Sequence, residues 1–395
     1  MTRTAHGYLL LIAALVAGCT SASDERVGDV AFTRADGVAL TANAIDTQVE
    51  KLMAAANVTG LAVALIGPDD VAYAKAYGFA DVARDAPLAT DTVMYGASLT
   101  KSTFAYAVMT LVDEGRVDLD APIADLLPKP LSDYDKYTDL TEDPRWRSWS
   151  LRTLLSHASG LPNWRWFMPE EKLTIMFEPG TRYAYSGEGI QVAQLVLEEA
   201  YGIDVNALMQ ERVFDRFGMA RTSMLWREDF RDNLARGYAK DGENLGHNMR
   251  QSVRAAGSMD TTLADYATFL AALQRGDGIT AASKREMLRP QIRITSEAQF
   301  PTQFWKDTDA NDAIELSYGL GWGLFRSRFG PAYFKEGHDD GWNNYALCLI
   351  EAERCILLLS NSSNGESIFL YLVDRLLGET GLPWRWEGYV PYDRQ

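Results

Sequence analysis

The sequence predicts an α/β protein in which an antiparallel sheet, built from both ends of the chain and flanked by helices, carries an inserted, mainly helical part. Strand-like apolar runs occur early in the chain and again near its end. Between them, from Ser98 to about Leu273, apolar residues follow helical spacing and long polar loops interrupt them. We expect the domain to occupy residues 41–395, with 41–97 and 310–395 in the α/β part and 98–309 in the helical part.

The first residues have the composition of an export signal. Arg3 precedes an apolar run from Tyr8 to Ala17, which is too short to span a bilayer of about 30 Å. Residues 1–18 are therefore predicted to be a signal peptide. The small residues before Cys19 resemble a bacterial lipoprotein processing site, which implies cleavage before Cys19 and lipidation of that residue. A plain signal peptide that contains a cysteine is the alternative.

Residues 19–40 are polar and are expected to form a linker after the lipidated cysteine. Several acyl chains on one residue give stable membrane anchoring, whereas a single chain does not. The expected location is the cell envelope, as an exported, periplasm-facing lipoprotein anchored at the outer membrane.

The elements of the domain are expected in the following order. Ala44, Val49 and Leu52 share one side of a helix over 43–55. Two apolar runs separated by Gly67-Pro68-Asp69-Asp70 predict a hairpin with strands over 60–66 and 71–77. The remaining expected elements are strands over 318–325, 345–350 and 356–359 and a helix over 367–377.

The two cysteines of the mature domain, Cys348 and Cys355, flank a polar break between two apolar strands. A hairpin would place them opposite one another. An exported protein meets oxidising conditions that permit a disulfide, and two buried free thiols are the equal alternative because thiols pack as small hydrophobes.

Composition excludes several classes of function. The formal net charge is −16 and Lys and Arg do not cluster, so nucleic acid is not an expected partner. Three cysteines exclude a zinc site made of four cysteines. A zinc site built on a His-x-x-x-His pair is also excluded, because the sequence has no such pair.

The first chemical motif is Ser98-Leu99-Thr100-Lys101, which precedes a helical run. Residues three apart lie on the same side of a helix, so Ser98 and Lys101 are expected to meet at its N-terminus. A serine hydroxyl needs a base beside it to become a nucleophile, and a desolvated lysine can lose its proton near neutral pH. Taken alone, the motif also fits an N-cap serine with a surface lysine.

Two further motifs lie later in the chain. Tyr185, in Tyr185-Ser186-Gly187, could act as a general base if two lysines stabilised its phenolate. In Lys335-Glu336-Gly337-His338, glycine lets the backbone approach a substrate, and the N–H groups of His338 and Ser98 could form an oxyanion hole. Alone, these motifs also fit a structural loop aromatic and an exposed, charged strand end.

Together and in this order, the motifs resemble those of the serine β-lactamase and penicillin-binding-protein superfamily. The second motif, with Tyr185 followed by Ser186, resembles that of the superfamily's class C β-lactamase-like branch. This branch includes D,D-peptidases, esterases and D-amino-acid-specific peptidases. The resemblance covers roughly residues 40–380 and implies a β-lactamase/transpeptidase-like fold. Other segments that resemble this branch are Leu154–Pro162, Ala255–Met259, Tyr318–Trp322 and Leu358–Asn361.

The resemblance implies a serine hydrolase that acts on an ester or amide of a small molecule or peptide. Ser98 would form an acyl-enzyme and Lys101 would help to deprotonate it. Tyr185 would share the base role and protonate the leaving group, while Lys335 would hold positive potential over the site. The N–H groups of Ser98 and His338 would stabilise the oxyanion. The resemblance implies no metal and no organic cofactor.

Three residues are expected to bind substrate: Gly187, Glu336 and Gly337. Two of them depart from the family pattern, which usually has Asn at the position of Gly187 and Thr or Ser at that of Glu336. An ionised glutamate repels a substrate carboxylate that a hydroxyl would bind. If Glu336 points inward, neutral esters, neutral amides or a cationic amine become the favoured substrates, with weak β-lactamase activity at most.

Two other functions compete with this interpretation. A Ser-His-Asp hydrolase would need a Gly-x-Ser-x-Gly turn, which is absent around Ser98, and His157 is interpreted as a structural hydrogen-bonding residue. A non-catalytic penicillin-recognising module of the cell envelope is the second alternative, and the presence of all four candidate side chains argues against it.

Aromatic residues gather in loop-like sequence between the first two motifs. We expect them to pack the helical part, because large aromatics dominate cores. The alternative is that they wall an apolar acyl pocket. They are Trp146, Trp149, Trp164, Trp166 and Phe167.

Overall fold

A nine-stranded antiparallel sheet forms the centre of the protein in a computed structural model, which describes residues 1–2, 29–303 and 306–394. The strand order is β10-β11-β12-β13-β14-β15-β3-β4-β5, so strands from the two ends of the chain meet where β15 pairs with β3. The predicted fold class is confirmed. In spatial order the strands are β10 (Ile292–Arg293), β11 (Ser317–Tyr318), β12 (Gly323–Ser327), β13 (Gly330–Asp339), β14 (Trp342–Leu349), β15 (Arg354–Ser360), β3 (Gly60–Ile66), β4 (Val71–Asp81) and β5 (Ala86–Pro87).

Helices and three small two-stranded pairs complete the described part of the chain. The pairs are β1 (Val30–Thr33) with β2 (Ala39–Thr41), β6 (Met94–Tyr95) with β9 (Asp260–Thr261), and β7 (Gly237–Tyr238) with β8 (Asn244–Gly246). The α-helices are α1 (Ala42–Ala56), α2 (Leu99–Asp113), α3 (Ile123–Leu126), α4 (Leu151–Leu155), α5 (Gly187–Ala200), α6 (Val205–Met209), α7 (Leu263–Arg275), α8 (Ala281–Met287), α9 (Glu366–Leu376) and α10 (Trp384–Glu387).

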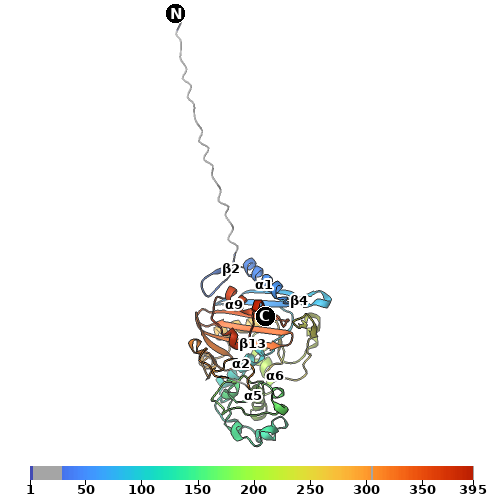
Figure 1. Cartoon of the computed structure of the whole chain (residues 1–395), viewed down its shortest axis with the longest axis vertical. Coiled ribbons are helices and arrows are strands. Elements are labelled where there is room, and N and C mark those ends of the chain that lie inside the picture. Colours follow the sequence, from blue (N-terminus) through green and yellow to red (C-terminus); the bar gives the residue numbers. More distant parts are fainter. Residues whose placement is uncertain (3–28, 304–305, 395) are drawn as a thin grey trace.

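The sheet separates two apolar layers because alternate residues of a strand point to opposite faces. In β3, Leu61, Val63 and Leu65 belong to the layer formed with α1 and α9. Ala62 and Ala64 point to the other layer, where their small side chains leave room for α2 and α7. Figure 1 shows α1 and α9 at the upper end and the mainly helical part around α5 at the lower end.

The structure differs from the sequence-based expectations at three places. The single strand expected over 318–325 is two strands, β11 and β12, separated by a turn in which Gly321 has φ +79°. The sheet begins earlier than expected, because β10 lies within 98–309. Residues 30–40, which were expected to belong to the linker 19–40, form the hairpin of β1 and β2 together with Thr41. The rest of the predicted signal peptide beyond residue 2, and Cys19, lie outside the described residues.

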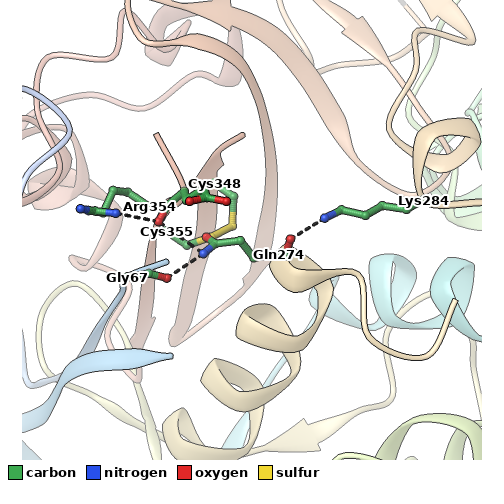
Figure 2. Close-up of a disulfide and its surroundings, with 7 residues drawn as sticks. Gly67, Gln274, Lys284, Cys348, Arg354 and Cys355 are labelled. Atoms are coloured by element: carbon green, nitrogen blue, oxygen red, sulfur yellow. Dashed lines mark hydrogen bonds between the residues drawn. A yellow bond between two sulfur atoms is a disulfide. The ribbon is translucent and has the colours of Figure 1, made fainter. Parts of the chain in front are cut away.

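Of the two alternatives for the domain cysteines, the structure has the disulfide. Cys348 and Cys355 face each other across the β14–β15 hairpin, with their Cα atoms 4.1 Å apart. Beside the disulfide, Nε2 of Gln274 donates hydrogen bonds to the carbonyl oxygens of Gly67, at 2.7 Å, and Glu353, at 3.3 Å (Figure 2). The end of α7 therefore ties this hairpin to the turn between β3 and β4.

Within the described ranges, no helix has both the length and the apolar character needed to cross a membrane.

Candidate active site

Ser98 lies at the N-terminus of α2, where the chain enters the helix through an unusual turn. Ala97 has φ +46°, a left-handed conformation that non-glycine residues seldom adopt. Ser98 occupies the N-cap position, but its side chain makes no capping hydrogen bond. Instead, Nζ of Lys101 lies 2.9 Å from Oγ of Ser98. The hydroxyl is therefore paired with the lysine rather than with the helix backbone.

The surroundings of Lys101 favour its neutral form. The side chain is completely buried, and Nζ also donates to the carbonyl oxygen of Ala256 at 2.5 Å. Burial lowers the pKa of Lys101 well below its usual value, and the positive charge of Lys335 lowers it further. A neutral amine has a lone pair, so Lys101 can accept the hydroxyl proton of Ser98.

Tyr185 and Lys335 complete the cluster. The hydroxyl of Tyr185 lies 3.1 Å from Nζ of Lys335, and Nζ of Lys101 lies 5.0 Å from the centre of the Tyr185 ring. Tyr185 comes from the loop before α5 and Lys335 from β13, so the fold gathers these side chains from distant parts of the chain. The structure thus brings together all four residues that the sequence motifs singled out.

Glu336 points toward the same cluster. Its Oε1 atom accepts hydrogen bonds from Nζ of Lys335 at 2.8 Å and from Nε2 of Gln299 at 3.2 Å. Burial and the Glu336 carboxylate raise the pKa of Tyr185 well above its usual value. This differs from the expectation that neighbouring lysines stabilise a phenolate. Tyr185 is therefore a protonated phenol, able to donate rather than accept a proton at neutral pH.

Close packing of β13 brings its backbone to the nucleophile. A Cβ atom on Gly337 would lie 2.6 Å from the carbonyl oxygen of Gly96, so no side chain fits there. The imidazole of His338 is directed toward Asn343, whose Nδ2 lies 2.9 Å from Nδ1, and toward Glu366, with Oε2 at 3.2 Å. Hydrogen bonding to Glu366 raises the pKa of His338.

His157 supports the tyrosine loop. Its Nδ1 atom accepts a hydrogen bond from the N–H of Ser186 at 3.1 Å, and its ring packs on Tyr185 with centroids 4.4 Å apart. Burial lowers the pKa of His157 well below its usual value, so the ring is neutral. This geometry is that of a structural hydrogen-bonding residue.

A cavity of about 570 Å³ opens over the cluster. Gly187 and Gly337 are not among its lining residues, because Trp164 covers Gly187 and Gly337 packs on the Gly96 turn. Trp146 and Trp149 belong to the core, as expected, whereas the other three aromatics of that stretch line the cavity. The lining of the cavity includes Ser98, Lys101, Asn163, Trp164, Trp166, Phe167, Tyr185, Phe300, Glu336 and His338.

Part of the cavity wall was not predicted from the sequence. Gln299 and Phe300 come from the long segment between β10 and β11, and Glu387 and Tyr389 come from the C-terminal segment. Glu387 is buried, and its Oε2 lies 2.9 Å from the hydroxyl of Tyr345. Burial and the nearby Glu336 raise the pKa of Glu387 well above its usual value. These residues carry no local motif that would have marked them.

Among residues 1–2, 29–303 and 306–394, no group of three or more His, Cys, Asp or Glu side chains is placed to hold a metal ion.

Comparison with known proteins identifies the family. The family model described as Beta-lactamase matches residues 45–377. The chain belongs to this family. It is 24% identical over 330 residues to Penicillin-binding protein 4* of Bacillus subtilis, covering 74% of this chain and 66% of that protein. It is 30% identical over 176 residues to Lovastatin esterase of Penicillium rubens, covering 38% of this chain and 44% of that protein.

A solved structure shares the fold. The octameric penicillin-binding protein homologue from Pyrococcus abyssi matches with a TM-score of 0.70 and 22% identity, covering 89% of this chain and 80% of that one. Among curated relatives, the chain spans less than two thirds of the length of both proteins named above. The solved structure shows the fold, and the family model shows membership of the Beta-lactamase family.

Proposed function

We propose that this protein is a serine hydrolase that forms an acyl-enzyme at Ser98 from a neutral ester or amide. The observation that carries the proposal is the 2.9 Å separation between Oγ of Ser98 and Nζ of Lys101. The lysine is fully buried beside a second cation, so its neutral form is favoured. A hydroxyl paired with a neutral amine is an activated nucleophile.

In the proposed reaction, Oγ of Ser98 attacks the carbonyl carbon of the substrate and its proton passes to Lys101. The N–H groups of Ser98 and His338 stabilise the oxyanion. When the carbonyl re-forms, the bond to the leaving group breaks and Tyr185, a phenol with a raised pKa, donates the proton that this group needs. Water then attacks the acyl carbon and gives its proton to the Tyr185 phenolate. Lys101 returns its proton to Oγ of Ser98 as the ester bond to Ser98 breaks, and the acyl group leaves as an acid.

Charge in the cavity supports neutral substrates. Glu336 already occupies Nζ of Lys335, the cation that would otherwise bind a substrate carboxylate. Other acidic residues line the same cavity, namely Asp339, Asp340 and Glu366. The likeness to Lovastatin esterase supports an ester as substrate. We expect nitrocefin to be hydrolysed weakly at most.

The proposed location follows from the N-terminal sequence. We propose export to the cell envelope and anchoring through lipidated Cys19, so that the catalytic domain acts in the periplasm. The mass of the mature N-terminus tests this, because an unmodified Cys19 or cleavage elsewhere would remove the anchor.

A fluorophosphonate probe tests the proposed activity. The probe should label Ser98 of the wild-type protein, whereas Ser98→Ala and Lys101→Met should remain unlabelled. Ser102→Ala, on the same helix but hydrogen-bonded to Leu99 and Tyr266, is the matched control and should still be labelled. Folded wild-type protein without label at Ser98 would favour the alternative, a non-catalytic penicillin-recognising module.

A further inference from the structure

Two indoles form a flat wall at the mouth of the cavity. The rings of Trp164 and Trp166 stack with centroids 4.9 Å apart and planes 11° apart. Trp166 and Phe167 are each 51% exposed, and Phe300, which also lines the cavity, is 43% exposed. Exposure of several large aromatics around one cavity is unusual for a soluble surface and indicates a binding site.

The wall is held in a fixed position by the start of α5. Oγ of Ser186 donates to the carbonyl oxygen of Pro162 at 2.8 Å. The N–H groups of Gly187 and Glu188 donate to Oδ1 and to the carbonyl oxygen of Asn163, each at 3.1 Å. The chain before Trp164 is therefore fastened to the helix by hydrogen bonds at successive residues.

Gly187 is the residue that lets Trp164 lie there. A Cβ atom on Gly187 would come within 2.5 Å of Cη2 of Trp164, and two other ring carbons would lie at 2.6 and 2.7 Å. Any side chain at position 187 would therefore displace the indole. Trp164 also lies close to the reacting groups, because Nζ of Lys101 is 5.8 Å from its ring centre.

We propose that Trp164 and Trp166 form a subsite for a planar aromatic acyl group of the substrate. This inference rests on the proposed serine hydrolase function and names its substrate class. The leaving group must reach the hydroxyl of Tyr185, beside Lys335 and Glu336, so the acyl group takes the aromatic side of the cavity. Stacking on a rigid indole pair stabilises a flat ring without a cost in protein reorganisation.

Two isomeric esters test which part of the substrate the subsite binds. Methyl phenylacetate carries its ring on the acyl group, and benzyl acetate carries it on the leaving group. Trp166→Ala should lower the ratio of kcat/KM for methyl phenylacetate to that for benzyl acetate about ten-fold. Phe79→Ala, which removes a 40% exposed ring outside the cavity lining, is the control and should leave the ratio unchanged. An unchanged or increased ratio in Trp166→Ala overturns the proposal.

Binding without turnover separates this proposal from the proposed function. Calorimetry with Ser98→Ala and methyl phenylacetate should give a Kd that rises about ten-fold when Trp166→Ala is added, a change of ~1.4 kcal/mol. Binding of this kind in a protein whose wild type hydrolyses neither ester would leave the subsite standing and refute the hydrolase. Equal affinity with and without Trp166 would refute the subsite, whatever the activity.

A double-mutant cycle tests the steric role of Gly187. In the Ser98→Ala background, Gly187→Ala should weaken binding of methyl phenylacetate because the new methyl group displaces the Trp164 ring. When Trp164→Ala is already present, Gly187→Ala should have no further effect. Thermal unfolding of each variant controls for loss of the fold. Independent, additive effects of the two substitutions in folded protein would contradict the proposal.

Discussion

Substitution of Glu336 by glutamine removes the charge that we hold responsible for rejecting anionic substrates. The amide of Glu336→Gln keeps an oxygen that can accept from Lys335, so the geometry is retained. A substrate carboxylate that reaches Nζ of Lys335 at about 2.8 Å would have Glu336 on the other side of that nitrogen, also at 2.8 Å.

The two carboxylates would then be about 5.6 Å apart, and their repulsion at an effective dielectric constant of about 20 is ~3 kcal/mol. We therefore expect selectivity for an anionic over a neutral substrate to rise about 100-fold in Glu336→Gln. This rise in selectivity reflects the loss of the negative charge alone, because glutamine keeps the oxygen that contacts Lys335.

The assay compares kcat/KM for 3-acetoxybenzoate, whose leaving group carries a carboxylate, with kcat/KM for its neutral methyl ester. Taking the ratio of the two substrates cancels any change in the reactivity of Ser98. Glu366→Gln is the matched control, since Glu366 lines the cavity but pairs with His338, and its effect on the ratio should be smaller. A ratio in Glu336→Gln within three-fold of the wild-type value would refute the reasoning.

Three further predictions concern the base, the histidine and the disulfide. For a neutral ester, kcat/KM should rise with pH as Lys101 loses its proton, below the pH near 10.4 at which an ordinary lysine titrates. Glu336→Gln should shift this rise in kcat/KM to lower pH, because the Glu336 carboxylate raises the pKa of Lys101. A rise at the same pH in Glu336→Gln and wild type contradicts this. His157→Ala should slow fluorophosphonate labelling of Ser98 about ten-fold without abolishing it, because His157 positions Tyr185; complete loss in folded protein would support a Ser-His hydrolase. The double variant Cys348→Ala/Cys355→Ala should have a free energy of unfolding, measured in urea, that is ~2.5 kcal/mol lower than wild type. This is the conformational entropy that a disulfide closing so short a loop removes from the unfolded chain. An unchanged free energy of unfolding contradicts this.

The sequence predicted those features that depend on local geometry. Ser98 and Lys101 lie one helical turn apart, so their contact follows from helix periodicity. The hairpin that pairs Cys348 with Cys355 follows from two apolar runs around a polar break. In both cases, a short stretch of chain determines which side chains meet.

Features that depend on tertiary packing were not predictable in this way. Neighbouring strand residues point to opposite faces, yet Lys335 and Glu336 form an ion pair. Gln299 and Glu387 reach the cavity from segments that have no motif and that only the completed fold brings together. The protonated state of Tyr185 depends on the Glu336 carboxylate, so it could not be deduced before that side chain was placed.

The most direct measurement is to quench the enzyme during hydrolysis of methyl phenylacetate and determine the mass of the peptide that contains Ser98. The account predicts a phenylacetyl group on Ser98 in the wild-type protein, and none in Ser98→Ala or Lys101→Met. Hydrolysis that continues in Ser98→Ala, or that proceeds in the wild type with the acyl group on another residue, would contradict it.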